Sequence, residues 1–230
     1  MGDEVFAFVT KARFKVEHRE RMQIRNPVIT IALLLALCAC SASYVKLNPK
    51  LDKKSVYDPL PLTIGFYKNP DFANREETRA LVYNQYSSYV FPLGKATLEL
   101  FEQILATMFT KVVPIQERDL KHISSSQSFA GIIEIDIKQF DAKFTSNYSF
   151  SFSITYNISI LDSNGTQIAI WPVTGNFDRA PCPRRLLCSK SEMAEFVILN
   201  AMAKFMVDFH NKPEITRWLI VHGVKEGGAK

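Results

Sequence analysis

The sequence lacks a hydrophobic run long enough for a permanent membrane span. Its main apolar stretch extends from Val28 to Leu37, whereas a helix needs roughly 20 apolar residues to cross a bilayer core. Arg25 precedes this stretch, and small residues such as Ala39 and Ser41 follow it. A short apolar run between a basic residue and small residues is typical of a secretory signal peptide. We therefore expect a cleaved targeting segment rather than a transmembrane helix.

The sequence also lacks a strong excess of charge of either sign. It contains 28 Lys and Arg against 23 Asp and Glu, a formal net charge of +5. Nucleic-acid-binding domains usually show a clustered basic face, so this weak surplus predicts no nucleic-acid partner. Hydrophobic residues make up 47% and aromatic residues 12% of the chain, which excludes intrinsic disorder for its main part.

Motifs for catalysis and metal binding are missing as well. The histidines after the apolar stretch, His122, His210 and His222, are isolated, and no His-x-x-His or His-Glu-x-x-His pair occurs. The sequence contains no Gly-x-Ser-x-Gly elbow and no glycine-rich phosphate loop. A catalytic centre needs a base or nucleophile with neighbouring partners. We therefore expect a protein that is not an enzyme and that binds no metal and no cofactor.

Four cysteines are present, and two of them end the apolar stretch. The segment Leu37-Cys-Ala-Cys40 resembles the lipobox of bacterial lipoproteins. In that family the final cysteine is lipidated and becomes the first residue of the mature chain, which implies a lipid anchor on Cys40. Two alternatives stay open. One is lipidation of Cys38, although a leucine directly before the cut fits poorly, and the other is a plain signal peptide with incidental cysteines.

The residue after the lipidated cysteine implies a location within the envelope. In Gram-negative lipoproteins, aspartate at this position retains the protein in the inner membrane, and here the position holds Ser41. The resemblance therefore implies an outer-membrane lipoprotein, held by palmitate-type acyl chains in the inner leaflet and facing the periplasm. An inner-membrane location is the alternative.

Composition divides the chain into five segments. Residues 1–21 are charged and long for the start of a signal peptide, so we expect Met22 to be the true start and 1–21 to be an extension outside the protein. Residues 22–39 are the expected signal peptide and 40–61 a tether between membrane and domain. Residues 62–222 are expected to form a single domain, and 223–230 a disordered tail.

A second pair of cysteines, Cys182 and Cys188, lies in a proline-containing segment. In an oxidising envelope compartment, such a nearby pair predicts a disulfide. Closing a loop of about seven residues stabilises a fold by roughly 2 kcal/mol in the chain-entropy model. A zinc site is the weaker interpretation, because the spacing is not Cys-x-x-Cys and no further His or Cys lies nearby.

Hydrophobic periodicity predicts the elements of the domain. Apolar residues at helical spacing predict helices over 93–109 and, after the capping box of Ser189 and Glu192, over the residues up to 211. Alternation predicts three successive strands at 133–137, 150–160 and 166–173, with a type I′ turn at Asn164-Gly165 between the last two. Shorter runs predict strands at 62–67 and 111–115, the second near a sheet edge because of Pro114. Residues 214–222 fit either a short strand or a helical turn.

These elements predict an α+β fold, a two-layer α/β sandwich. The sheet is expected to be mostly antiparallel, with two helices on one face. The other face would be free and would carry the Ser, Thr and Asn side chains of 149–159.

Tyrosines spaced three apart, Tyr83, Tyr86 and Tyr89, occur in a segment that is otherwise hard to interpret. Aligned tyrosine rings suggest a surface for a partner or ligand. The alternative is a strand or irregular edge that packs its rings on the domain.

The succession of these features resembles YajG-type envelope lipoproteins. The resemblance rests on the lipobox, the first strand, the Leu-Phe-x-x-Ile-Leu helix at 100–105, the turn at Asn164-Gly165 and the alanine-containing helix at 200–205. It covers about residues 60–212 and fails at the tyrosine segment and at the Cys182–Cys188 loop. The same outline recurs in the auxiliary lipoproteins of lipid-exporting ABC systems.

This resemblance implies a function without catalysis. The chain would be a binding or assembly factor of the bacterial cell envelope, with the membrane and another envelope protein as its partners. The alternative is an auxiliary lipid-handling subunit of an envelope ABC transporter.

Overall fold

The computed structural model describes residues 42–51, 58–80, 88–115, 129–144, 150–179 and 189–224. All of them belong to one compact unit, Ala42–Lys230. The extension 1–21, the signal peptide 22–39 and Cys40 lie outside the described residues, so those predictions stay predictions.

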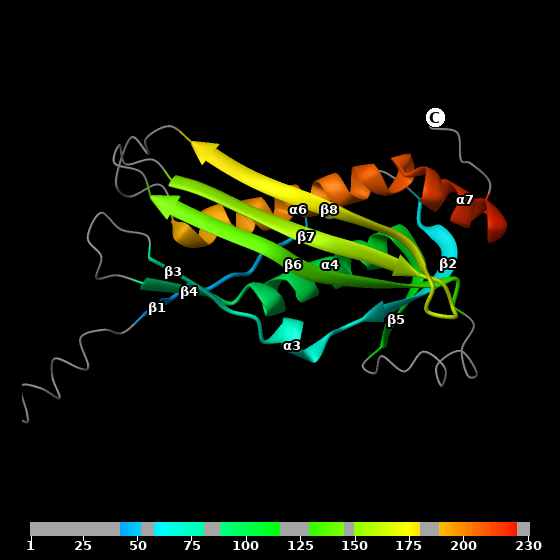
Figure 1. Ribbon diagram of the computed structural model, residues 1–230, viewed down its shortest axis with the longest axis horizontal. Helices are drawn as coiled ribbons and strands as arrows, with labels where there is room; N and C mark the ends of the chain where they lie inside the picture. The colour runs from blue at the N-terminus through cyan, green and yellow to red at the C-terminus, as the bar shows by residue number, and fades with distance from the viewer. Residues whose placement is uncertain are drawn as a thin grey trace, which may run out of the picture. The chain divides into compact units, whose positions relative to one another are not determined.

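A five-stranded sheet forms one layer of the domain (Figure 1). Its strand order is β5-β2-β6-β7-β8, with β2 at Leu60–Tyr67, β5 at Phe109–Ile115, β6 at Gly131–Phe144, β7 at Phe150–Leu161 and β8 at Gln167–Arg179. All five predicted strands are present, and Pro114 lies in the edge strand β5, as predicted.

The pairing of these strands is mixed. β2 pairs in parallel with β5 on one side and with β6 on the other, whereas β6–β7 and β7–β8 are antiparallel. The physical reason is the helix between β2 and β5, because a crossover of this kind returns the chain to the end where the first strand began. Two of the four strand pairs are therefore parallel, whereas the two antiparallel pairs, β6–β7 and β7–β8, contain most of the paired residues, as predicted.

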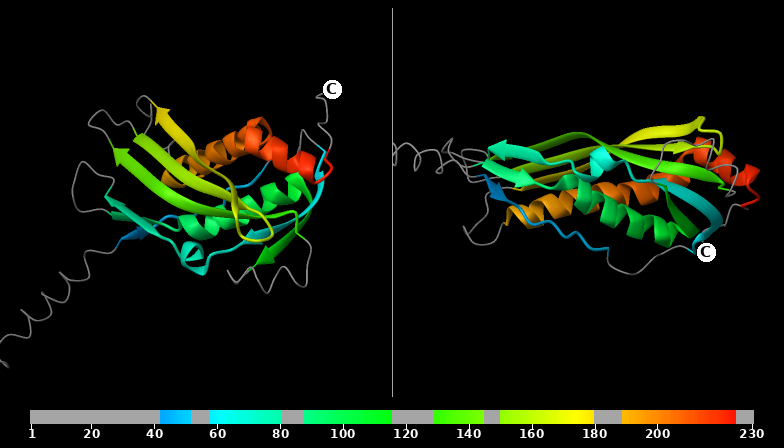
Figure 2. Two further views of the ribbon diagram at one scale, coloured as in Figure 1. Left: turned by 45° about the vertical axis from the view of Figure 1, so that its right-hand side comes forward. Right: turned by 90° about the horizontal axis from the view of Figure 1, so that it is seen from below.

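Helices cover one face of this sheet (Figures 1 and 2). They are α4 at Leu93–Met108 and α6 at Lys190–Asn211, followed by α7 at Pro213–Val221. The capping box of Ser189 and Glu192 is present at the start of α6. The α+β class and the two predicted helices on one face are confirmed, and the undecided segment 214–222 is helical.

Aromatic rings fill the layer between helices and sheet. Phe101 of α4 contacts Phe66 of β2 and Phe205 of α6, with ring centroids 5.5 and 5.2 Å apart, and Phe205 stacks on Trp171 of β8 at 5.9 Å. All of these rings are buried. Each fully buried ring of this size stabilises the fold by about 2–3 kcal/mol, so this layer holds the two helices on the sheet.

A second, three-stranded sheet lies at one end of the domain and was not predicted. Its order is β1-β4-β3, with β1 at Ser43–Tyr44, β4 at Ser88–Phe91 and β3 at Glu77–Ala80, and the short helix α3 at Pro70–Ala73 precedes it. The strands have two to four residues each, too few to show a periodicity. Their positions therefore depend on contacts with distant parts of the chain.

The expected tether is largely part of the domain. Val45 is 8% exposed, and Leu47 and Leu51 pack against the main core. Ser43 and Tyr44 pair in parallel with Tyr89 and Val90. The prediction of a free tether over 40–61 is therefore wrong for residues 42–51, because the few aliphatic side chains of this segment pack on the core.

The predicted tail also begins later than expected. Gly223 N and Val224 N donate to Ile220 O and Leu219 O, each at 3.0 Å, and close the end of α7. Val224 packs against the main core. The first two residues of 223–230 thus complete a helix end, and 225–230 lie outside the described residues.

The hairpin between β7 and β8 differs in detail from the predicted type I′ turn. Gly165 N donates to Asp162 O at 3.0 Å, which places Ser163 and Asn164 at the centre of the turn, and Gly165 follows with φ 83°. Asp162 Oδ1 accepts from Asn164 N and Thr166 N, at 2.8 Å each. The loop therefore has one residue more than a type I′ turn, and the glycine occupies the left-handed position after the turn.

Candidate functional site

The end of the domain that carries β1 is the first part of the fold after Cys40. Val45 N donates to Val90 O at 2.9 Å, which continues the pairing of β1 with β4. Tyr44 is 62% exposed, and its hydroxyl donates to Glu76 Oε1 at 2.7 Å. This hydrogen bond to a carboxylate is the main reason why the pKa of Tyr44 is raised above its ordinary value.

The first two turns of α6 hold residues 46–48 from the other side. Ser191 Oγ donates to Lys46 O, and Asn48 N donates to Glu195 Oε1 at 2.7 Å. The Lys190 ammonium lies 4.3 Å from the centre of the Tyr89 ring. Residues 43–48 are thus held between β4 and α6 by these contacts.

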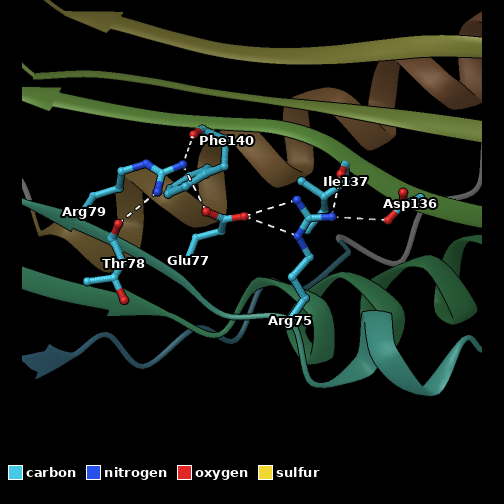
Figure 3. A network of polar contacts seen from close by, with 7 residues as sticks. All are labelled: Arg75, Glu77, Thr78, Arg79, Asp136, Ile137 and Phe140. Atoms are coloured by element: carbon cyan, nitrogen blue, oxygen red, sulfur yellow. Dashed lines mark hydrogen bonds and ion pairs between the residues drawn. The ribbon is translucent and has the colours of Figure 1, made fainter.

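An arginine–carboxylate network joins the small sheet to the main one (Figure 3). Glu77 of β3 accepts from two guanidinium groups, that of Arg75 at 3.2 Å and that of Arg79 at 3.0 Å. Arg75 also lies 3.4 Å from Asp136 Oδ1. The Glu77 side chain is 18% exposed and the two arginine side chains are each 33% exposed, so the network is only partly shielded from water.

The same arginines satisfy backbone carbonyls on the open edge of β6. The described pairing of β2 with β6 reaches Glu134, and β6 continues for ten residues beyond it. Arg75 Nη1 donates to Ile137 O and Arg79 Nη2 to Phe140 O, both at 2.7 Å. An unmade hydrogen bond at a buried carbonyl costs about 1–3 kcal/mol. By donating to these two carbonyls, the arginines avoid this cost and stabilise the edge of β6.

Sequence reasoning missed this network, although a signal exists. Arg75, Glu77 and Arg79 alternate in the sequence, and alternate residues of a strand lie on one face. The partners Ile137 and Phe140 lie 62 and 61 positions away. The local sequence pattern can therefore suggest that these charged side chains lie in a row, but it cannot show that they contact β6.

The face of the main sheet opposite the helices is mainly polar over β6, β7 and β8, with Ile170 and Pro172 of β8 as apolar exceptions. We call it the polar sheet face; its rows across the three strands are Asp136–Asn157–Pro172, Gln139–Thr155–Thr174 and Asp141–Ser153–Asn176. The Thr155 and Thr174 hydroxyls lie 2.9 Å apart. The predicted ladder of Ser, Thr and Asn side chains thus lies on β7, the middle strand of this face.

The polar sheet face does not extend over the whole sheet. Towards β5 and β2, a small apolar cluster of Ile115, Phe129 and Ile132 packs separately from the main core. The predicted free face is therefore apolar at this end and polar at the other.

Side chains of α6 block part of the open edge of β8. Lys204 Nζ donates to Thr174 O at 2.7 Å, and Asn200 Oδ1 accepts from Asn176 N at 3.3 Å. Pro172 on the same strand has no amide proton to offer. An edge treated in this way is a poor template for pairing with another strand, so the polar sheet face is a more accessible surface than this edge.

Two polar groups lie within the core. Tyr156 of β7 and Thr97 of α4 are both 0% exposed and share a hydrogen bond of 2.8 Å. Burial raises the pKa of the Tyr156 phenol well above its ordinary value. This pair fixes α4 on the sheet, and its phenol stays protonated at any physiological pH.

Among the predicted site residues, Tyr89 is the one that the structure describes. It lies in β4, partly buried against the main core and next to Lys190. Tyr83, Tyr86, Cys40, Cys182 and Cys188 lie outside the described residues. The packing of Tyr89 fits the alternative in which the tyrosine segment packs its rings on the domain.

The histidines of the described part contact their own helices. His222 Nδ1 lies 2.9 Å from Trp218 O, and the His210 ring contacts Phe209. Within the described ranges, no three His, Cys, Asp or Glu side chains are close enough together to hold a metal ion. A search of the same residues finds no helix with the length and apolar content of a membrane span.

Comparison with known proteins gives weak similarities. No family model matches the chain, and no curated protein matches it. Protein XCC0632 from Xanthomonas campestris, of the DUF330 family, is similar at 10% identity and a TM-score of 0.44, over 80% of this chain and 96% of that one. Lipoprotein GNA1162 from Neisseria meningitidis has 10% identity and a TM-score of 0.34, over 64% and 99% of the two chains. Hypothetical protein CT253 from Chlamydia trachomatis has 10% identity and a TM-score of 0.37, over 71% and 97%. At this level of similarity, arguments about function rest on the residues of this chain.

Proposed function

We propose that this protein is a lipid-anchored lipoprotein of the bacterial cell envelope, of the YajG type, and that it acts without catalysis as a binding or assembly factor. The anchor is Cys40, in the outer membrane on the side that faces the periplasm. The observation that carries the proposal is the lipobox-like segment Leu37–Cys40. It ends two residues before Ala42, where the folded unit begins.

The anchor is tested by removing its cysteine. Cys40→Ala is expected to abolish incorporation of labelled palmitate and to release the domain from the membrane fraction. The matched control is Cys38→Ala, which removes the neighbouring thiol and should leave both the label and the fractionation unchanged. Continued labelling of the Cys40→Ala protein would refute the assignment of the anchor.

The proposed binding surface is the polar sheet face, with the tyrosine segment as the second candidate. Serine, threonine and asparagine side chains on a regular sheet offer hydrogen-bonding groups at fixed spacing, while α4 and α6 hold the opposite face. A pulldown of the anchored protein in mild detergent should recover an envelope protein as a stable partner. Ser153→Arg, in the centre of the face, and Tyr83→Ala with Tyr86→Ala distinguish the two surfaces. If neither change weakens the complex, both candidates are wrong.

The alternative function, lipid handling for an ABC transporter, needs an apolar groove between helix and sheet. In the described residues, Phe101, Phe205 and Trp171 fill that layer and are at most 4% exposed. No specific observation therefore favours this alternative.

The disulfide between Cys182 and Cys188 is part of the same proposal. Residues 179 and 189, which flank this segment, belong to the end of β8 and to the cap of α6. Protein purified from the envelope should resist thiol alkylation at both cysteines until it is reduced, with a matching mass change after reduction. Alkylation of the unreduced protein at both sites would contradict the disulfide.

A further inference from the structure

The chain between the proposed anchor and the fold is very short. Ser43, the first residue of β1, follows Cys40 by three positions. Because an extended chain spans at most about 3.6 Å per residue, these positions cover about 11 Å. A lipid on Cys40 thus fixes how far β1 can lie from the bilayer surface. This step rests on the anchor proposed above.

β1 cannot extend this reach by detaching at low cost. Tyr44 pairs with Val90, Val45 is 8% exposed, and Lys46 O accepts a hydrogen bond from Ser191. Burial of a valine side chain alone stabilises by about 1.5 kcal/mol or more. The short connection therefore holds the domain itself, and not just a flexible leader, next to the membrane.

Several other parts of the fold meet at the same end. Ala80 pairs with Ser88, next to the pairing of Tyr89 with Ser43. Phe150 pairs with residues 144 and 179, at the far end of the β6–β7–β8 sheet. Figure 1 shows the ends of these strands, β1 and the start of α6 at the same end of the main sheet, opposite the turn between β7 and β8.

Two lysines belong to this end in the described part of the chain. Lys46 is exposed and lies two positions after Tyr44, the last residue of β1, and Lys190 is the first residue of α6. Basic residues are attracted to the anionic surface of a bilayer, so these two lysines favour contact with such a surface.

We propose that the β1 end of the domain, with Ser43, Tyr44, Lys46 and Lys190, lies against the anionic lipid headgroups and is held there by the short connection to Cys40. Tyr44 is exposed at this end, and tyrosine is a residue that favours the boundary between membrane and water. Its hydroxyl donates a hydrogen bond to the Glu76 carboxylate.

The orientation has a consequence for the polar sheet face. β7 has 12 residues, and at about 3.4 Å per residue it is about 40 Å long. β7 runs from the β1 end towards the hairpin at Asp162, so this hairpin lies farthest from the bilayer. The polar sheet face then extends from the membrane outwards and stays accessible to a partner along its length.

The orientation can be measured by fluorescence quenching in vesicles. The lipidated full chain is reconstituted into phosphatidylethanolamine–phosphatidylglycerol vesicles that contain a lipid with a nitroxide on its headgroup. One protein carries an azide-bearing amino acid with a fluorophore in place of Ser43, and a second carries it in place of Ser163. We expect the label at position 43 to be quenched several-fold more strongly than the label at 163.

The outcomes separate this inference from the proposed function. A protein that floats with the vesicles but shows equal quenching at both positions would overturn the orientation and leave the anchor intact. A protein that does not float with the vesicles would overturn both.

A longer connection tests the cause of the orientation. A Gly-Ser linker of about 20 residues, inserted between Ser41 and Ala42, has a root-mean-square length of about 25 Å. It should lower the quenching at position 43 several-fold without changing the thermal unfolding of the domain. Undiminished quenching in this protein would overturn the role of the short connection.

Discussion

Gly175 shows how closely α6 approaches β8. A Cβ atom at this position would lie 1.9 Å from Val197 O and 2.8 Å from Ala201 N, both backbone atoms of α6. In the sequence, this glycine looks like an isolated glycine within a strand. The structure explains why glycine is needed here. The backbone of α6 lies so close to position 175 that there is room for a hydrogen atom but not for a Cβ atom.

Replacing this glycine should therefore be costly. Gly175→Ala forces α6 away from the sheet, and overpacking of this kind destabilises by about 1–3 kcal/mol, occasionally more. The measurement is the free energy of unfolding in urea. The control is Ser153→Ala, on the neighbouring strand opposite Asn176, which should change the stability by less than about 0.5 kcal/mol. Equal effects of the two changes would contradict the close approach.

Tyr156 predicts a specific dependence of stability on pH. Its folded pKa is raised by burial above the usual value of about 10. The stabilisation linked to the protonated phenol is fully present below about pH 10 and is lost as the pH rises towards the folded pKa. Tyr156→Phe should therefore give a shallower decline of the unfolding free energy above about pH 10, by up to about 1.4 kcal/mol per pH unit.

The same substitution has a cost at neutral pH. It leaves the buried hydroxyl of Thr97 without its partner, which costs about 1–3 kcal/mol. Adding Thr97→Val should recover part of this loss, because both polar groups are then absent. An alkaline decline that is identical in the wild-type protein and in Tyr156→Phe would show that the buried phenol is not responsible.

At the scale of elements, the small sheet depends on charged groups more than on its own strands. β1, β3 and β4 contain two to four residues each, and isolated strands of this length are not stable. Arg75, Glu77 and Arg79 connect this sheet to the open edge of β6. The arginines of this network donate hydrogen bonds to two backbone carbonyls of β6, those of Ile137 and Phe140, in the part of β6 beyond its pairing with β2.

Glu77→Gln should loosen this connection without unfolding the domain. It removes the carboxylate shared by two guanidinium groups, and because these groups are partly exposed we expect a loss of about 1 kcal/mol or less. Amide hydrogen exchange of β3 and β4 should become faster, while that of β7 stays unchanged. The control is Glu99→Gln, which breaks the exposed pair Lys95–Glu99 on α4 and should leave both regions unchanged. Unaltered exchange in β3 after Glu77→Gln would contradict the role of the network.

At the scale of the whole molecule, the domain includes the segment that follows the anchor. A chain that begins at Asp58 lacks Val45, Leu47 and Leu51, which pack on the core. We expect it to be less stable than a chain that begins at Ala42 by about 2 kcal/mol or more, the value of at least one buried aliphatic side chain. Urea unfolding of the two chains makes the comparison. Equal midpoints would restore the original prediction of a free tether.

The sequence by itself determined the elements whose pattern is local. α4, α6 and the strands β6 to β8 each contain enough residues to show a period of 3.6 or 2, and the hairpin and the capping box use neighbouring residues. The edge position of β5 followed from Pro114 for the same local reason. These elements also imply the layered α+β architecture, because their apolar faces must cover one another.

The tertiary structure decided everything that joins distant residues. The parallel pairing of β2 with β5 and β6, the docking of residues 42–51 between β4 and α6, and the contacts of Arg75 and Arg79 with β6 have no local signature. Each depends on where separate elements come to lie, which short-range patterns do not encode. The apolar stretch and Cys40 therefore indicate an anchor in the sequence, but the absence of a long tether behind it emerges only from the fold.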